Sequence, residues 1–452
     1  MVLVPYFPIF AVRTFMIIWC GQIVSAIGSA MTRFALTIWV WQLTEEATSI
    51  ALFSFFYQFP LVFVSLFAGV LVDRYNRKYL IILGDTIAIL CTIIIGLLYS
   101  TNNLLIWHLY CLIAISGCFG HIQNLAYEAS IPLMVPKQHY TRASSMSSLV
   151  THASTIIAPA LAGIFYPIIG LVGIIVVDVV SFAVAVGMFI FLQLPQPPRI
   201  EITNYESETI SQKLTLGFRY ILSRPGLLAM TIAFSCFWFA YQLGETLYQP
   251  MILARTDGNT QVLGVVMTAA GVGGVMGGLF LGISGGFKHR VHGMLVGFIG
   301  NGLSRAVFAL GQIPLVWIGS QFCSSVNLPL LFSSSSAIWY AKVAPSVQGR
   351  VFASDHTIGM IIGTVASLTA GPLADKVFEP AMKPGGFLTS VFSPIFGTGA
   401  GSGMALLYLI TSFFIVLVGL GGYIFPTLRN VEIALPDHDA IVTHASSATD
   451  KE

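Results

Sequence analysis

The stretch Gly69-Val70-Leu71-Val72-Asp73-Arg74-Tyr75-Asn76-Arg77-Lys78 decides how this chain folds. One apolar segment, 49–72, ends in it and a second, 79–99, begins directly after it, so six residues with four charges separate two membrane-length segments. A turn this short requires a small residue where the helices approach and a residue that tolerates left-handed backbone, and Gly69 and Asn76 suit these roles. Three cations at this place favour a cytoplasmic loop: Arg74, Arg77 and Lys78.

The composition indicates an all-α integral membrane protein. Of 452 residues 56% are hydrophobic and 9% are charged, whereas soluble domains carry about 25% charged residues. A helix needs about 20 apolar residues to cross a bilayer, and twelve segments meet that requirement. They lie near 13–41, 49–72, 79–99, 104–128, 142–169, 171–193, 226–253, 260–284, 291–311, 314–340, 350–372 and 404–428.

The placement of cations predicts the orientation of these segments. If both termini are cytoplasmic, the inside segments hold 16 of the 21 Lys and Arg residues and the outside segments hold three. The other two, Arg33 and Arg305, fall within spans. Cytoplasmic loops carry such an excess of cations. We therefore expect a protein of the inner or plasma membrane whose two termini both lie on the cytoplasmic side.

A polar linker at 195–224 divides the twelve spans into six plus six. We therefore predict an N-terminal six-helix bundle over 1–194, a C-terminal one over 225–428 and an exposed cytoplasmic tail over 429–452. Within the linker, apolar residues at helical spacing over 214–222 predict an amphipathic helix at the membrane surface.

The two halves also repeat weakly. Gly69 and Arg77 recur as Gly282 and Arg290, with an offset of 213 in both cases. Gly286 stands where the acid Asp73 would recur, so the copies are not equivalent. Such duplication is expected of a transporter built from two pseudo-symmetric bundles.

The opening stretch resembles the G-x-L-x-D-R-x-x-R-K signature between the second and third helices of the major facilitator superfamily. Six residues carry the match: Gly69, Leu71, Asp73, Arg74, Arg77 and Lys78. The resemblance implies a conformational latch, in which Asp73 lies near the start of the eleventh span, at 349–351, and Arg77 pairs with Glu128.

Two further stretches resemble the macrolide-efflux and siderophore-export branch of that superfamily. They are Ser25-x-x-Gly28-Ser29…Phe34-Ala35-Leu36-x-Ile38-Trp39 in the first span and 370–382 with the glycine-rich 397–403 after the eleventh. The resemblance extends to about Arg429 and implies a secondary-active exporter that works by alternating access.

Spans one and seven each carry a polar stripe at helical spacing. The stripes are Gln22, Ser25, Ser29 and Thr32/Arg33 in the first span, and Thr231, Ser235, Gln242, Glu245 and Gln249 in the seventh. Lipid would penalise these groups, so the stripes should face the protein interior. They either line a wet cavity or form a helix–helix interface joined by hydrogen bonds.

Arg33 and Glu245 are the sharpest candidates, because each lies about 12 Å below the outer end of its span. Charges at that depth require a partner or water. We hypothesise that Arg33 meets Glu245 when the protein is closed to the outside, and that Glu245 couples protons or recognises a cation. A structural ion pair is the alternative.

Other polar residues in spans are less specific. Further candidates for a cavity lining are Gln58, Gln123, Asn124, His152 and the aromatic Trp238. Asp85 and Asp355 lie near cytoplasmic ends, and we interpret Asp178 as structural or lipid-facing.

The predicted function is secondary-active export of an amphiphile, either a drug such as a macrolide or a siderophore, by proton antiport. No Gly-x-x-x-x-Gly-Lys-Ser/Thr loop is present, so ATP is not the direct energy source. All six cysteines fall in spans without metal-ligand spacing, and we expect no cofactor, no metal and no enzymatic activity. We expect a monomer in the lipid bilayer with no nucleic-acid partner; an importer or a non-transporting sensor of the same fold are the alternatives.

Overall fold

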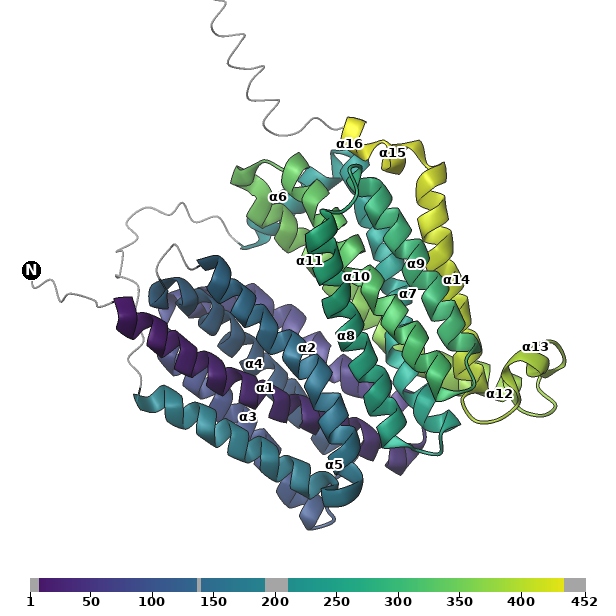
Figure 1. Cartoon of the computed structure of the whole chain (residues 1–452), viewed down its shortest axis with the longest axis horizontal. Helices are drawn as coiled ribbons and strands as arrows, with labels where there is room; N and C mark the ends of the chain where they lie inside the picture. Colours follow the sequence, from purple (N-terminus) through teal and green to yellow (C-terminus); the bar gives the residue numbers. More distant parts are fainter. Residues whose placement is uncertain (1–7, 136–139, 192–209, 435–452) are drawn as a thin grey trace, which may run out of the picture. The chain divides into compact units, whose positions relative to one another are not determined.

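The computed structural model describes residues 8–135, 140–191 and 210–434, and these residues are almost entirely helical (Figure 1). Within them, eleven helices are long and apolar enough to cross a membrane. The chain divides into two compact units: the first contains 1–203 and 256–268, and the second contains 204–255 and 269–452.

The first unit is built from five long helices. They are α1 (Pro8–Thr44), α2 (Ala47–Arg74), α3 (Arg77–Ser100), α4 (Ile106–Met134) and α5 (Tyr140–Phe191). Helix α1 packs along α5, and α4 packs against both α2 and α3 (Figure 1). The part of α8 (Thr260–Ser284) up to Thr268 also packs here, where the Thr260 hydroxyl donates to the Gly163 carbonyl of α5 at 3.2 Å.

Helix α5 contains both the fifth and the sixth predicted spans. Its 52 residues would extend about 78 Å if straight, far more than the roughly 30 Å of a bilayer core. The helix is interrupted at Gly170, which has φ 66° and ψ −173°. A side chain would disfavour this backbone, so the glycine allows the chain to turn between the two predicted segments.

The loop between α2 and α3 differs in detail from the prediction. Asn76 has φ −65°, so it is not left-handed. Instead its side chain accepts a hydrogen bond from the Lys78 amide at 3.0 Å and thereby caps α3. The Arg77 Nη1 atom donates to the Ala129 carbonyl of α4 at 2.5 Å. The short turn is therefore achieved by helix capping rather than by left-handed backbone at Asn76.

The second unit contains the remaining helices. The long ones are α7 (Pro225–Arg255), the rest of α8, α9 (Arg290–Leu310), α10 (Pro314–Lys342), α11 (Pro345–Leu373) and α14 (Ser402–Ile424). The shorter ones are α6 (Ile210–Leu222), the π-helical η2 (Ala374–Phe378), α12 (Glu379–Met382), α13 (Thr389–Phe396), α15 (Pro426–Arg429) and α16 (Val431–Ala434). The helix predicted in the linker is confirmed as α6, which packs on α11: a Cβ atom at Gly217 would overlap the Arg350 carbonyl.

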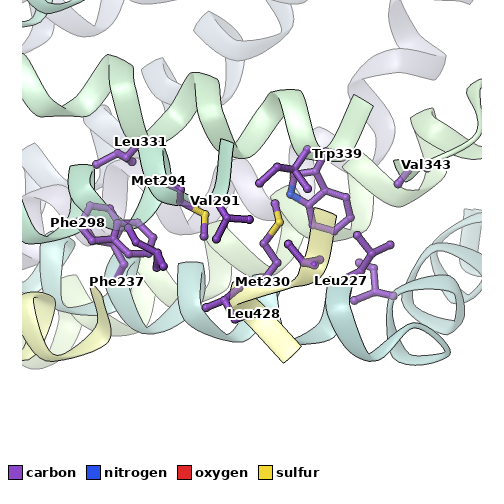
Figure 2. Close-up of a cluster of buried hydrophobic side chains, with 14 of the residues drawn as sticks. Leu227, Met230, Phe237, Val291, Met294, Phe298, Leu331, Trp339, Val343 and Leu428 are labelled. Carbon is purple, nitrogen blue, oxygen red and sulfur yellow. The ribbon is translucent and has the colours of Figure 1, made fainter. Parts of the chain in front are cut away.

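The core of this unit is formed largely by α7, α9 and α10 (Figure 2). The rings of Phe237 from α7 and Phe298 from α9 stack with centroids 4.5 Å apart. Leu331 and Trp339 of α10 join the same cluster, and Leu428 of α15 covers one side of it. These side chains are almost fully buried, so they fix the rotation of the helices that carry the polar residues described below.

The glycine-rich stretch before α14 has a structural role. The Glu379 carboxylate accepts a hydrogen bond from the Met404 amide at 2.9 Å and so satisfies the first turn of α14. A Cβ atom at Gly403 would overlap the Phe378 carbonyl, so this close approach requires glycine.

The pseudo-repeat is visible in the loop before α9. Arg290 donates to the Ala337 carbonyl of α10 at 2.7 Å, as Arg77 does to Ala129. This copy of the loop lacks a counterpart of Asp73, and an acid from the C-terminal segment, Glu432, lies there instead. Its two carboxylate oxygens accept hydrogen bonds from the Arg290 and Val291 amides, each at 3.2 Å. The prediction of an exposed tail from residue 429 is therefore wrong at Val431 of α16, which is fully buried.

We predict that Glu432→Ala lowers the free energy of unfolding by about 1 kcal/mol, because the first amides of α9 lose their acceptor and the helix dipole loses a nearby anion. Thermal unfolding of the purified protein in detergent would measure this change. Glu46→Ala is the matched control, since Glu46 stands at the N-cap of α2 but makes no capping hydrogen bond. Equal melting temperatures for both variants would contradict the capping role.

Candidate functional site

An ion pair joins α9 to α7 within the second unit. Arg305 of α9 is completely buried, and its Nη1 atom lies 3.4 Å from Oε2 of Glu245 on α7. Its Nη2 atom donates to the Tyr241 carbonyl at 3.1 Å. A guanidinium stays charged when it is buried and therefore requires a counter-charge, which Glu245 supplies to Arg305.

Two aromatic rings enclose the guanidinium. The Arg305 Cζ atom lies 4.5 Å from the Tyr241 ring centroid and 4.6 Å from that of Tyr408, which comes from α14. Cations over aromatic faces are attracted by the ring quadrupole, most strongly where water is excluded. The space for the guanidinium is left by Gly244, where a Cβ atom would overlap Arg305 Nη2.

The ion pair is open on one side only. The Glu245 side chain retains 33% of its exposure whereas Arg305 retains none. Next to Glu245 on α7, Tyr241 stacks on Trp238 with centroids 5.6 Å apart, and Trp238 meets Phe332 of α10 edge to face. An accessible carboxylate edge beside an aromatic surface could contact a ligand that is mostly apolar with a few polar groups.

A second polar cluster lies within the first unit. The Asp178 carboxylate of α5 is 1% exposed and accepts a hydrogen bond from the Ser29 hydroxyl of α1 at 3.3 Å. Arg33, one turn further along α1, interacts with it electrostatically. The two helices come this close because Gly28 has no side chain: a Cβ atom there would overlap the Ser181 hydroxyl.

Ser29, Arg33 and Asp178 line a cavity of about 70 Å³. It is formed by all five helices of the first unit, with Tyr57, Thr92, Ser116 and Asp178 among the polar lining residues. A cavity of this size holds a few water molecules, so it is suited to protons or small ions rather than to a large amphiphile.

Several of the predicted site residues are brought together within their own units. The amide of Gln123 on α4 donates to Gln22 of α1 at 3.3 Å, which joins two predicted residues of the first unit. In the second unit Trp238 and Gln242 both lie against Gly363 of α11.

Other predicted residues are not part of these clusters. Asn124 and Glu128 are exposed on α4, Gln58 is half-buried on α2, and His152 lies in α5. Of the predicted latch, Gly69, Asp73 and Arg74 lie in the last turns of α2, and Arg77 and Lys78 begin α3. The pairing of Arg77 with Glu128, the position of Asp73 near 349–351 and the meeting of Arg33 with Glu245 all stay predictions.

Sequence reasoning missed the partners of both predicted charges. Glu245 pairs with Arg305, and Arg33 acts on Asp178, which is buried rather than lipid-facing. The sequence could have indicated Arg305 as the partner of Glu245, because Arg305 is the only cation besides Arg33 within a predicted span. A single charge within a span requires a partner. Tyr408 carried no such signal, because its contact with Arg305 depends on how α14 packs.

Known proteins resemble this chain along most of its length. Macrolide efflux protein A from Streptococcus pyogenes is 23% identical over 366 residues, covering 80% of this chain and 90% of that protein. The enterobactin exporter EntS from Salmonella typhi is 27% identical over 265 residues, covering 56% of this chain and 59% of that protein. The crystal structure of the POT family transporter PepTSo superposes with a TM-score of 0.68 at 11% identity, covering 95% and 99% of the two chains, which supports the fold alone.

A family model described as "Transmembrane secretion effector" matches residues 4–288, which is more than half of the chain. The efflux and export relatives place it in the branch that the sequence motifs indicated. The chain is therefore a multi-pass membrane transporter that belongs to the transmembrane secretion effector family of the major facilitator superfamily.

Proposed function

We propose that this protein exports amphiphilic small molecules across the cell inner or plasma membrane in exchange for protons. It would do so by alternating access of two six-helix bundles with twelve spans, α5 contributing two of them on either side of Gly170. Both termini would be cytoplasmic, as the distribution of cations favours.

One observation carries this proposal: each unit holds a carboxylate that lies deep in a membrane-length helix and interacts with an arginine of the same unit. These are Glu245 with Arg305, and Asp178 with Arg33. Ionisable residues at membrane depth are costly, and they commonly mark proton or substrate pathways. Because protonation would remove the negative charge of a carboxylate, it would weaken the interaction with the arginine and free that arginine for a new partner.

The substrate class follows from the surroundings of Glu245. Aromatic side chains and one accessible carboxylate edge offer apolar contact with few fixed charges. That combination favours a large amphiphile over a sugar or a phosphate, which would need many amides or clustered arginines. Relatives named for macrolide efflux and enterobactin export support a macrolide or a siderophore as the first substrates to test.

Accumulation of a labelled macrolide and of a labelled catecholate siderophore in cells tests this function. Cells that produce the protein should accumulate less of at least one compound than cells that produce the Glu245→Ala variant. A protonophore should remove the difference. Higher accumulation with the active protein would indicate import, and a difference that survives the protonophore would contradict proton coupling.

A further inference from the structure

A second buried carboxylate in the first unit, besides Asp178, has no partner among the described residues. Asp85 of α3 is 4% exposed, and its Oδ2 atom has no hydrogen-bond partner among the described residues. No charged side chain in the described part of the chain interacts with it electrostatically. An ionised carboxylate in such a place costs several kcal/mol, so something must neutralise it.

Asp85 lies between a sealed apolar cluster and the polar cavity. One turn earlier on α3, Ile81 belongs to a cluster with Phe15 and Ile18 of α1. One and two turns later, Ala88 and Thr92 line the cavity that contains Arg33 and Asp178. Residues three, four and seven apart share a helix face, so Asp85 continues the face of α3 that borders the cavity.

Helix α1 shows the same order of residues. Ile18 belongs to the apolar cluster, Gln22 follows one turn later, and Ser29 and Arg33 line the cavity. The Gln22 Nε2 atom is also buried without a hydrogen-bond partner. Its Oε1 atom accepts from Gln123, and Gln123 packs on the position next to Asp85, since a Cβ atom at Gly84 would overlap the Gln123 Cβ atom. The side-chain amide of Gln123, bonded to Gln22, therefore lies beside α3 at the level of Gly84.

No ion pair joins Asp85 to any of the titratable or charged side chains in the described parts of α1, α4 and α5. On α4 these are His121, the buried Tyr127 and the exposed Glu128. On α3 itself, Arg77 is directed to the Ala129 carbonyl. Arg33 and Asp178 lie at the cavity, where they interact with each other.

We propose that Asp85 is a proton-binding site of the first unit, separate from Asp178, and that it exchanges its proton with the cavity past Thr92. This deepens the proposed proton-coupled function and rests on it for its physiological purpose. The binding itself requires only a proton and the Asp85 carboxylate, so it can be tested without any substrate.

Infrared difference spectroscopy of the purified, full-length protein during a pH titration tests this site. The protein should show the carbonyl band of a protonated carboxylic acid, and Asp85→Asn should lose part of that band. Asp355→Asn is the matched control, because the Asp355 carboxylate of α11 already accepts a hydrogen bond from Thr231. It should leave the Asp85 contribution intact.

An Asp85→Asn spectrum identical to that of the unchanged protein over the whole titration would overturn the proposal. A band that responds to sodium at constant pH would also overturn it, since the carboxylate would then bind a metal cation. If Asp85→Asn does not yield folded protein, the Asp85→Glu variant provides the test. The proposal requires that its carbonyl band be shifted relative to that of the unchanged protein. Because no substrate is present, a failure of export would leave this spectrum unaffected.

Discussion

Glu245→Ala is expected to abolish export and to destabilise the second unit by about 3–5 kcal/mol, the cost of leaving a buried charge without its partner. Arg305 would keep its two tyrosine rings and the Tyr241 carbonyl but would lose its only ion-pair partner among the described residues. Thermal unfolding in detergent and substrate efflux from cells measure the two effects separately.

The paired variants sharpen this prediction. Arg305→Ala should be similarly inactive, and the double variant Glu245→Met with Arg305→Met should recover most of the lost stability without recovering export. Arg305→Lys should be impaired too, because an ammonium lacks the planar fork whose two ends reach Glu245 and the Tyr241 carbonyl. It also lacks the flat guanidinium that lies against the rings of Tyr241 and Tyr408. A Glu245→Ala protein with unchanged stability and transport would contradict a functional ion pair.

Asp178→Asn is expected to uncouple export from the proton gradient while substrate binding is retained. Asparagine keeps the size of the side chain and can still accept from Ser29, but it can neither carry a proton nor balance the charge of Arg33. The expected result is an affinity close to that of the unchanged protein and pH-gradient-driven transport reduced to the background of empty vesicles. Equilibrium binding and vesicle transport measure the two quantities.

Ser116→Ala is the matched control for Asp178→Asn, because Ser116 lines the same cavity without a charge. It should leave the pH dependence of transport unchanged. A loss of substrate affinity in Asp178→Asn, with coupling intact, would instead place Asp178 in the substrate site and contradict its role in proton transfer.

The sequence alone predicts much of this fold for a simple physical reason. Lipid requires long apolar helices and confines charges to loops. The positions of the spans, of the short loop before α3 and of the family motif can therefore be predicted from the sequence. The break inside α5 was predicted as a boundary between two spans, near the observed interruption at Gly170. The capping role of Asn76 was missed, because a short polar residue suits both a cap and a left-handed turn.

The site was predictable only in part. The polar stripes singled out Arg33 on α1, which is exposed, and Glu245 on α7, which is partly exposed, because their periodicity lies within one helix. The buried charges that these residues face, Asp178 and Arg305, come from other helices. Which residue meets Glu245 or Arg33 depends on the rotation of a second helix, which sequence periodicity does not set. The packing around Phe237 and Phe298 helps to orient Arg305 toward Glu245, and Gly28 allows Asp178 to reach Ser29; these are tertiary effects.

Proton movement in proteoliposomes tests the central claim most directly. Purified protein would be reconstituted with a macrolide gradient and a pH-sensitive dye inside the vesicles, with the Glu245→Ala protein as the inactive reference. The account predicts that macrolide flowing in one direction drives protons in the other, and that the reference shows neither movement. Macrolide transport without proton movement, or with protons moving in the same direction, would contradict it.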